Sequence, residues 1–196
     1  PAELPTIDKI VRADMISLAE LATRARSDVE RNWGSPQQEV TEVHPPEMPT
    51  RFAGQLQTMV QALKVINHHE TGKFDLLGED INILNKLALD SVTKMRRIIM
   101  QELSKYDVIE TVGLATKLGL PTNSVRRYLE DLTALEISDR ERGTGPKGDR
   151  WNIKPYYRNL MARFEGITME AHELTENNAE AEEIKEKEPQ QKEIFA

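Results

Sequence analysis

The stretch VIETVGLATKLGLPTNSVRRYLEDLTALEISDRERGTGPKGDRWNI, residues 108–153, decides how this chain folds. Residues 111–118 (TVGLATKL) have apolar side chains at helical spacing, and the tripeptide Gly-Leu-Pro at 119–121 interrupts them. A second helix is predicted to begin directly after this break. Three adjacent polar residues are candidates for its N-cap: Thr122, Asn123 and Ser124.

The second helix is predicted to have one apolar side. Val125, Leu129 and Leu132 recur at spacings of four and three, which places them on one face of a helix. Arg126 and Arg127 fall on other faces, where they would meet solvent or a partner.

A β-hairpin is predicted after this helix. Residues 137–142 and 150–153 are short strand-like runs on either side of the turn-rich segment GTGPKGD at 143–149. Two such runs around a Gly/Pro turn are typical of a hairpin.

The order of these elements resembles the winged helix-turn-helix superfamily of DNA-binding domains. The resemblance rests on the turn at 118–121, the helix with paired arginines, the LxxLxALEI pattern at 129–137 and a basic, glycine-rich wing closed by Trp151. It covers roughly a quarter of the chain, and the order of elements is more specific than any single residue. We expect Trp151 to pack in the core rather than stack on a base.

The resemblance implies DNA contacts from the start of the second helix, which enters the major groove in such domains, and from the wing. The candidate DNA-binding residues are Thr122, Asn123, Ser124, Arg126, Arg127, Arg140, Arg142, Lys147 and Arg150. The alternatives are that the three polar residues act only as caps, that the arginines are solvated and that the wing is an ordinary hairpin.

Charge is divided unevenly along the chain. The formal net charge is -7, and residues 165–196 carry ten Glu against three Lys, so the remainder is neutral. Residues 90–158 carry thirteen Lys/Arg against ten Asp/Glu, which gives +3 and a mildly basic candidate domain. Residues 168–196 are predicted to be an acidic tail that is either disordered or a fraying, solvated helix.

The composition limits the classes of function. Cysteine is absent, which excludes disulfides, thiolate zinc sites and a thiol nucleophile, and suits a cytoplasmic protein. No apolar run approaches the length of a membrane span, and no signal peptide is visible. The start at Pro1, without methionine, indicates a processed or partial chain. No complete catalytic site is present, so we expect neither an enzyme nor a bound cofactor.

The remaining periodicity predicts further helices. They are expected over 4–31, from Thr50 to Ile66, over 79–89 with Leu87 inward, and over 91–106, with residues 67–75 as an interruption. The helix at 91–106 would be the first of the winged helix, with Met95, Ile98 and Leu103 inward and Arg96 and Arg97 on the other side. Residues 155–167 are expected to form an amphipathic helix with Tyr156, Leu160 and Phe164 on one face.

The predicted fold is therefore mainly α, with an N-terminal helical region and a C-terminal winged helix of three helices and a hairpin wing. Four parts are expected: residues 1–49, a helix and a Pro-rich connector in which 39–43 is extended; 50–89, a helical region; 90–167, the winged helix; and 168–196, the tail.

A second, looser resemblance concerns residues 46–91, which are similar to the helical lid of AAA+ ATPases of the replicative-helicase type. It implies that Arg51 senses a nucleotide bound to a phosphate loop outside this chain. The sequence favours the simpler alternative, a helical bundle with Arg51 on its surface. His68, His69 and Glu70 lack the spacing of a metal site, so no metal is expected.

Three functions stay open. The first is double-stranded DNA binding by the end of a larger AAA+ ATPase that acts in replication or mobile-element maintenance. The second is a stand-alone transcription regulator whose N-terminal helices form a homo-oligomer or sense a ligand. The third is a winged helix that binds protein rather than DNA.

Overall fold

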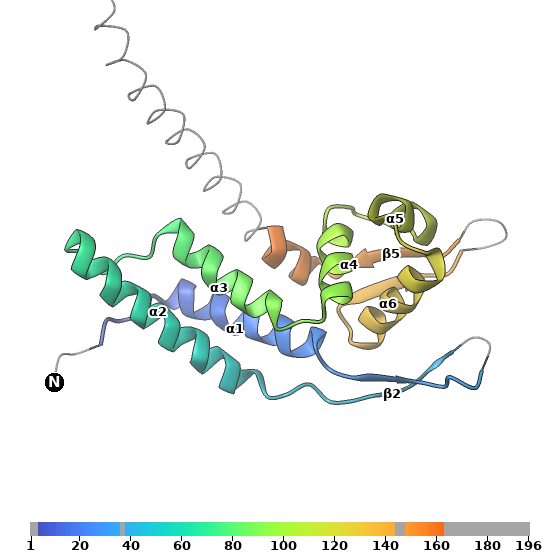
Figure 1. Cartoon of the computed structure of the whole chain (residues 1–196), viewed down its shortest axis with the longest axis horizontal. Helices are drawn as coiled ribbons and strands as arrows, with labels where there is room; N and C mark the ends of the chain where they lie inside the picture. Colours follow the sequence, from blue (N-terminus) through green and yellow to red (C-terminus); the bar gives the residue numbers. More distant parts are fainter. Residues whose placement is uncertain (1–3, 36–37, 144–147, 163–196) are drawn as a thin grey trace, which may run out of the picture.

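The computed structural model describes residues 4–35, 38–143 and 148–162, which form a mainly helical molecule with two small antiparallel sheets. Three helices, α1 (Lys9–Ala25), α2 (Pro49–Thr71) and α3 (Gly78–Asp90), lie side by side at one end of the molecule (Figure 1). A winged helix occupies the other end. This arrangement confirms the predicted fold class.

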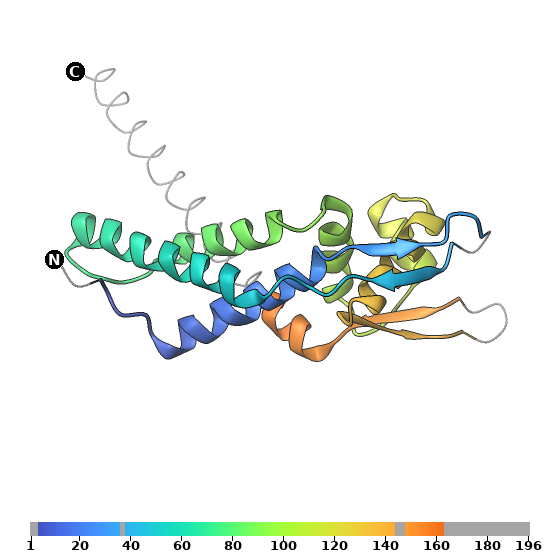
Figure 2. The same cartoon turned by 90° about the horizontal axis from the view of Figure 1, so that it is seen from below.

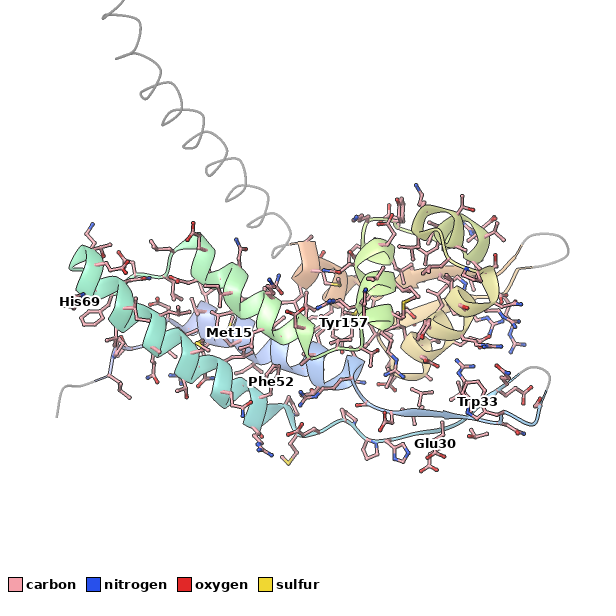
Figure 3. All side chains as sticks on the ribbon, in the orientation of Figure 1. Met15, Glu30, Trp33, Phe52, His69 and Tyr157 are labelled. Carbon is pink, nitrogen blue, oxygen red and sulfur yellow. The ribbon has the colours of Figure 1, made fainter. Side chains whose placement is uncertain are left out.

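The three N-terminal helices bury only part of the apolar faces that their periodicity predicts. Met15 and Leu18 of α1 and Leu56 of α2 are almost fully buried, whereas Ile10 at the start of α1 is exposed. Met15 and Phe52 are labelled in Figure 3, where they lie on the neighbouring helices α1 and α2.

Two predicted helix boundaries were wrong. The first helix does not reach Arg31 but ends at Ala25, because residues 29–31 pair with a second strand instead. The second does not stop at Ile66 but continues to Thr71 and ends where Gly72 adopts a left-handed φ of 75°. The polar run after Ile66 is accommodated because the buried Asn67 donates a hydrogen bond to Asp80 (2.6 Å).

A hairpin outside the winged helix joins α1 to α2. Strand β1 (Val29–Arg31) pairs antiparallel with β2 (Val40–Val43), with an irregularity in register between Glu30 and Arg31. The predicted extended segment at 39–43 is thus confirmed, although its partner strand was expected to be helical. In Figure 2 this hairpin runs along the winged helix, in the same direction as the wing.

The winged helix contains α4 (Lys94–Ser104), β3 (Ile109–Glu110), α5 (Thr111–Leu118), α6 (Thr122–Ala134), β4 (Ser138–Glu141) and β5 (Arg150–Ile153). Its sheet has the order β3-β5-β4, and both pairings are antiparallel. Trp151 of the central strand is fully buried and its Nε1 donates to Thr111 Oγ1 (2.8 Å), which ties the wing to the start of α5.

Helix α4 forms the floor of the winged helix, as predicted, but it spans 94–104 rather than 91–106, and Met95 and Ile98, which were predicted to face inward, are only half-buried. Ile99 and Leu103 are fully buried against the other elements. The prediction for Arg96 was wrong: its side chain is buried, because it binds the carbonyl oxygens of Ala25 and Ser27 at the end of α1. The inward placement of Leu87 was also wrong, since 44% of this residue is exposed on α3.

The chain is helical again from 155 to 162, the last described residue. Tyr157, Leu160 and Met161 are the buried residues of this segment. The predicted apolar face was therefore wrong at Tyr156, which is exposed and donates its hydroxyl to Ser17 Oγ (2.8 Å). Phe164 and the tail lie outside the described residues.

Candidate nucleic-acid interface

The turn between α5 and α6 presents the start of α6 to solvent. Gly119 has a left-handed φ of 63°, which glycine adopts without strain, and Leu120 donates its N–H back to Ala115 O (3.0 Å). Pro121 then precedes the first helical residue. The predicted caps were therefore wrong: Thr122, Asn123 and Ser124 lie inside α6, and no side chain caps it.

These three residues form the exposed first turn of the helix. Thr122 and Asn123 are exposed and Ser124 is half-buried. Within the described part of the chain, none of their side chains has a hydrogen-bond partner. Their hydroxyl and amide groups, together with the unpaired backbone N–H groups of the first turn, are free to bind phosphate or base edges.

The paired arginines follow directly. Arg126 and Arg127 are half-buried, and among the described residues neither forms an ion pair with a carboxylate. The Nε of Arg126 is buried without an acceptor. Arg126 lines a hollow together with Glu39, Val40 and Glu130, on the side of α6 that faces away from Leu129 and Leu132.

The wing presents less free positive charge than the sequence suggests. Arg140 pairs with Asp149, lies 3.6 Å from Glu130 and stacks over the Trp151 ring (5.1 Å from guanidinium carbon to centroid). Arg150 lies 3.5 Å from Glu141.

Of the other two wing candidates, the structure describes only Arg142. Arg142 is exposed and lines the same hollow as Arg126. Lys147 lies outside the described residues. The structure thus brings Arg126, Arg140 and Arg142 together around one hollow. Arg150, which pairs with Glu141 across the hairpin, does not line this hollow.

Sequence reasoning missed a buried cluster behind α6. Asp131 accepts hydrogen bonds from Arg31 of β1 (2.6 Å) and from Arg96 of α4 (3.4 Å), and the three side chains are at most 10% exposed. No signal in the sequence links these residues, since they are separated by 100 and 35 positions. The cluster holds α6 against both α4 and the β1–β2 hairpin.

The other candidates from the sequence do not assemble into a site. Arg51 is exposed, with Glu47 as its ion-pair partner at 3.8 Å, so its role as a nucleotide sensor stays a prediction. His68 and His69 lie in the last turns of α2 rather than in a loop, and His68 stacks on Phe74 (3.9 Å between centroids). In the described residues, no group of three or more His, Asp or Glu is placed to hold a metal ion. No described helix has the length and apolar character of a membrane span.

Comparison with known proteins gave fold-level similarities only. No protein-family model and no curated protein matches the chain. A "possible transcriptional regulator" from Methanosarcina mazei is 25% identical over 52% of this chain and 86% of its own, with a TM-score of 0.32. S. aureus MepR, solved with DNA, is 14% identical over 63% of this chain and 94% of its own, with a TM-score of 0.40.

A mutant of Lactococcus lactis ZitR is 18% identical over 74% of this chain and 97% of its own, also with a TM-score of 0.40. At these TM-scores the similarities assign neither a family nor a function to this chain. The function has to be argued from the geometry of α6 and its surroundings.

Proposed function

We propose that this chain binds double-stranded DNA through its winged helix, with the first turn of α6 in the major groove. The observation that carries the proposal is the state of that turn: Thr122 and Asn123 are exposed and unbonded, and Arg126 and Arg127 follow without ion-pair partners in the described structure. In helix-turn-helix docking the N-terminal residues of the second helix contact base edges.

The charges on α6 favour contact between DNA and the beginning of the helix rather than its whole length. The free cations lie near the N-terminus of the helix, where the helix dipole also favours a phosphate. Glu130 and Asp131 lie further along and are held by Arg31, Arg96 and Arg140. We therefore propose that Arg126 and Arg127 contact the DNA in the major groove, and that Arg142 of the wing contacts the DNA phosphate backbone beside this groove.

The segment before the winged helix contacts α4 and α6, which bears on the function of the whole chain. The end of α1 supplies the two carbonyl groups that hold Arg96, and the strand after α1 supplies Arg31 to α6. We therefore propose a stand-alone DNA-binding regulator, without catalytic activity and acting in the cytoplasm, in which the residues before the winged helix contact α6. Neither a bound nucleotide nor an ATPase partner is needed for this role. The predicted homo-oligomer stays a prediction, which a measurement of the molecular mass by light scattering would test.

The test is duplex binding by fluorescence anisotropy at two or more salt concentrations. Removing both charges in the variant Arg126→Ala/Arg127→Ala should weaken binding about tenfold or more and lower the salt slope by up to about 2. The matched control is Lys9→Ala/Arg12→Ala, which removes the same charge from exposed positions at the far end of α1.

Three outcomes separate the functions. If only the α6 variant loses affinity, the proposal stands. If both variants lose affinity equally, binding is a non-specific charge effect. If the folded wild-type protein binds no duplex even at low salt, the proposal is wrong, and the alternative of a protein-binding winged helix is the one to test next.

A further inference from the structure

The outward face of α6 is partly occupied by another segment of the same chain. Because Val125, Leu129 and Leu132 face the core, the opposite side of the helix carries Arg126, Glu130 and Ala134 at helical spacing. Glu39 and Val40 of the β1–β2 hairpin line one hollow with those three residues. This is the face that a duplex would meet beyond the first turn of α6.

Arg31 attaches the hairpin to this face. All five N–H donors of its guanidinium have acceptors: Asp131 twice (2.6 and 3.1 Å), Glu130 (3.1 Å), and the carbonyl oxygens of Arg127 (2.6 Å) and Gln38 (2.8 Å). Only 5% of the side chain is exposed. Of these acceptors, Glu130, Asp131 and the Arg127 carbonyl belong to α6, so the contact joins the hairpin to the recognition helix directly.

The charge of the hairpin opposes DNA. Residues 28–44 contain four carboxylates, Asp28, Glu30, Glu39 and Glu42, against one cation, Arg31, which gives -3 with His44 neutral. The single cation is turned toward α6, and the carboxylates are left toward solvent or the hollow. A segment that served as a second DNA-contacting arm would carry the opposite charge, because phosphates repel carboxylates.

We propose that the β1–β2 hairpin is an autoinhibitory element that covers the recognition helix, and that a duplex binds fully only when the hairpin moves away. This inference rests on the proposed DNA binding. The hairpin lies alongside α6 and the wing in Figure 2, and Figure 3 shows Trp33 and Glu30 on it.

The open state is accessible because α6 does not depend on the hairpin for charge balance. When Arg31 leaves, Glu130 still has Arg140 at 3.6 Å and Asp131 still has Arg96 at 3.4 Å. An isolated two-stranded hairpin is only marginally stable, and this one buries no residue completely in either strand. Segments with few buried contacts open at low free energy.

A covalent lock tests the inference. The chain has no cysteine, so Val40→Cys/Ala134→Cys introduces the only pair, on two residues that line the same hollow. Joining the thiols with a short bismaleimide should weaken duplex binding about tenfold or more relative to the same protein before cross-linking. Each single-cysteine variant treated with the reagent controls for modification of the surface.

A second pair of variants opens the hairpin without changing the charge that α6 presents. Glu130→Gln is the reference, and Arg31→Ala/Glu130→Gln differs from it by loss of Arg31 and its hydrogen bonds to α6. The accompanying loss of one positive charge would by itself weaken DNA binding, so tighter binding cannot be a charge effect. If about a tenth of the molecules are open in the reference, the second variant should bind DNA about tenfold more tightly. Circular dichroism on both confirms that they are folded.

The outcomes distinguish this inference from the proposed function. Weaker binding after cross-linking together with tighter binding without Arg31 supports autoinhibition. Equal binding by locked and unlocked protein, or weaker binding by the variant without Arg31, overturns it, while the dependence on Arg126 and Arg127 still supports DNA binding. If no form binds duplex DNA, the proposed function fails and autoinhibition fails with it.

Discussion

At the scale of single residues, the structure depends on a carboxylate that the sequence does not distinguish. Asp131 receives Arg31 on one oxygen and Arg96 on the other, and Arg96 in turn binds the last carbonyl groups of the α1 segment. Because each carboxylate oxygen has its own cation, the loss of one cation leaves the buried carboxylate compensated by the other, whereas the loss of both would leave a buried charge without a partner. Three segments distant in the sequence are thereby held at one point.

His44 is the residue through which pH should act on the hairpin. Its Nε2 lies 3.0 Å from Glu30 Oε1, and this hydrogen bond, aided by the charges of Glu30, Glu42 and Asp28, raises the pKa of His44. Because the pKa of His44 in the folded protein lies above the unfolded value of about 6.5, the contribution of its contact with Glu30 to folding stability is fully present below about pH 6.5. It is lost as the pH rises through the raised pKa.

An NMR titration of the imidazole checks this prediction. The pKa of His44 should fall in the variant Glu30→Gln, and the signal can be assigned from its absence in His44→Gln. An unchanged midpoint in Glu30→Gln would mean that the contact does not persist in solution.

At the scale of elements, α4 supports the winged helix from below. Leu103 is fully buried, whereas Arg97, on another side of the same helix, pairs with Asp90 near the surface. Leu103→Ala should therefore destabilise the protein by about 2–5 kcal/mol, through lost apolar contact and the cavity left behind. Arg97→Ala should cost less than about 1 kcal/mol, as is usual for partly exposed ion pairs.

Chemical denaturation of both variants beside the wild type measures this difference. Comparable small losses in the two variants would show that the orientation of α4 is incorrect. Leu103 touches no proposed DNA contact, so any loss of DNA affinity in its variant should appear only near the melting point.

At the scale of the whole molecule, the helical region and the winged helix share contacts that make them one unit. Arg24 of α1 donates to Glu136 after α6 (2.8 Å), and Tyr156 reaches back to Ser17. Buried apolar residues form one cluster that runs from α1 to the segment after the wing. We therefore expect a single cooperative unfolding transition.

Two probes test this expectation. In a Trp33→Phe background, Trp151 is the only tryptophan and reports on the winged helix, while circular dichroism at far-ultraviolet wavelengths reports on all helices. The two transitions should coincide. Leu84→Ala, a change in α3 far from Trp151 in sequence, should shift both by the same amount; a shift in the circular dichroism signal alone would indicate two independent units.

Much of the fold follows from local sequence. The helices α5 and α6, the break between them at 119–121, the hairpin after α6 and the burial of Trp151 follow from local patterns of spacing and backbone preference, and they were predicted correctly. Such patterns suffice because a helix or hairpin needs only neighbouring residues to set its apolar face.

Three of the errors arose where distant segments meet. Residues 29–31 are a strand because β2 pairs with them, Arg96 is buried because the end of α1 offers its carbonyl groups, and Tyr157 replaces Tyr156 inside because the last helix packs on α1. A helical period identifies an apolar face but not a buried charge, since burial of a charge depends on partners supplied by other elements.

The sequence by itself determined that this chain contains a winged helix and that the start of α6 carries polar and cationic residues suited to DNA. Only the tertiary structure decided which of those cations are free. Arg126 and Arg127 are unpaired among the described residues, Arg140 is held by Asp149 and Glu130, and Arg31 joins an acidic hairpin to the same helix. The physical reason is that charge pairing acts over a few ångströms in space, whereas sequence patterns report only on neighbours along the chain.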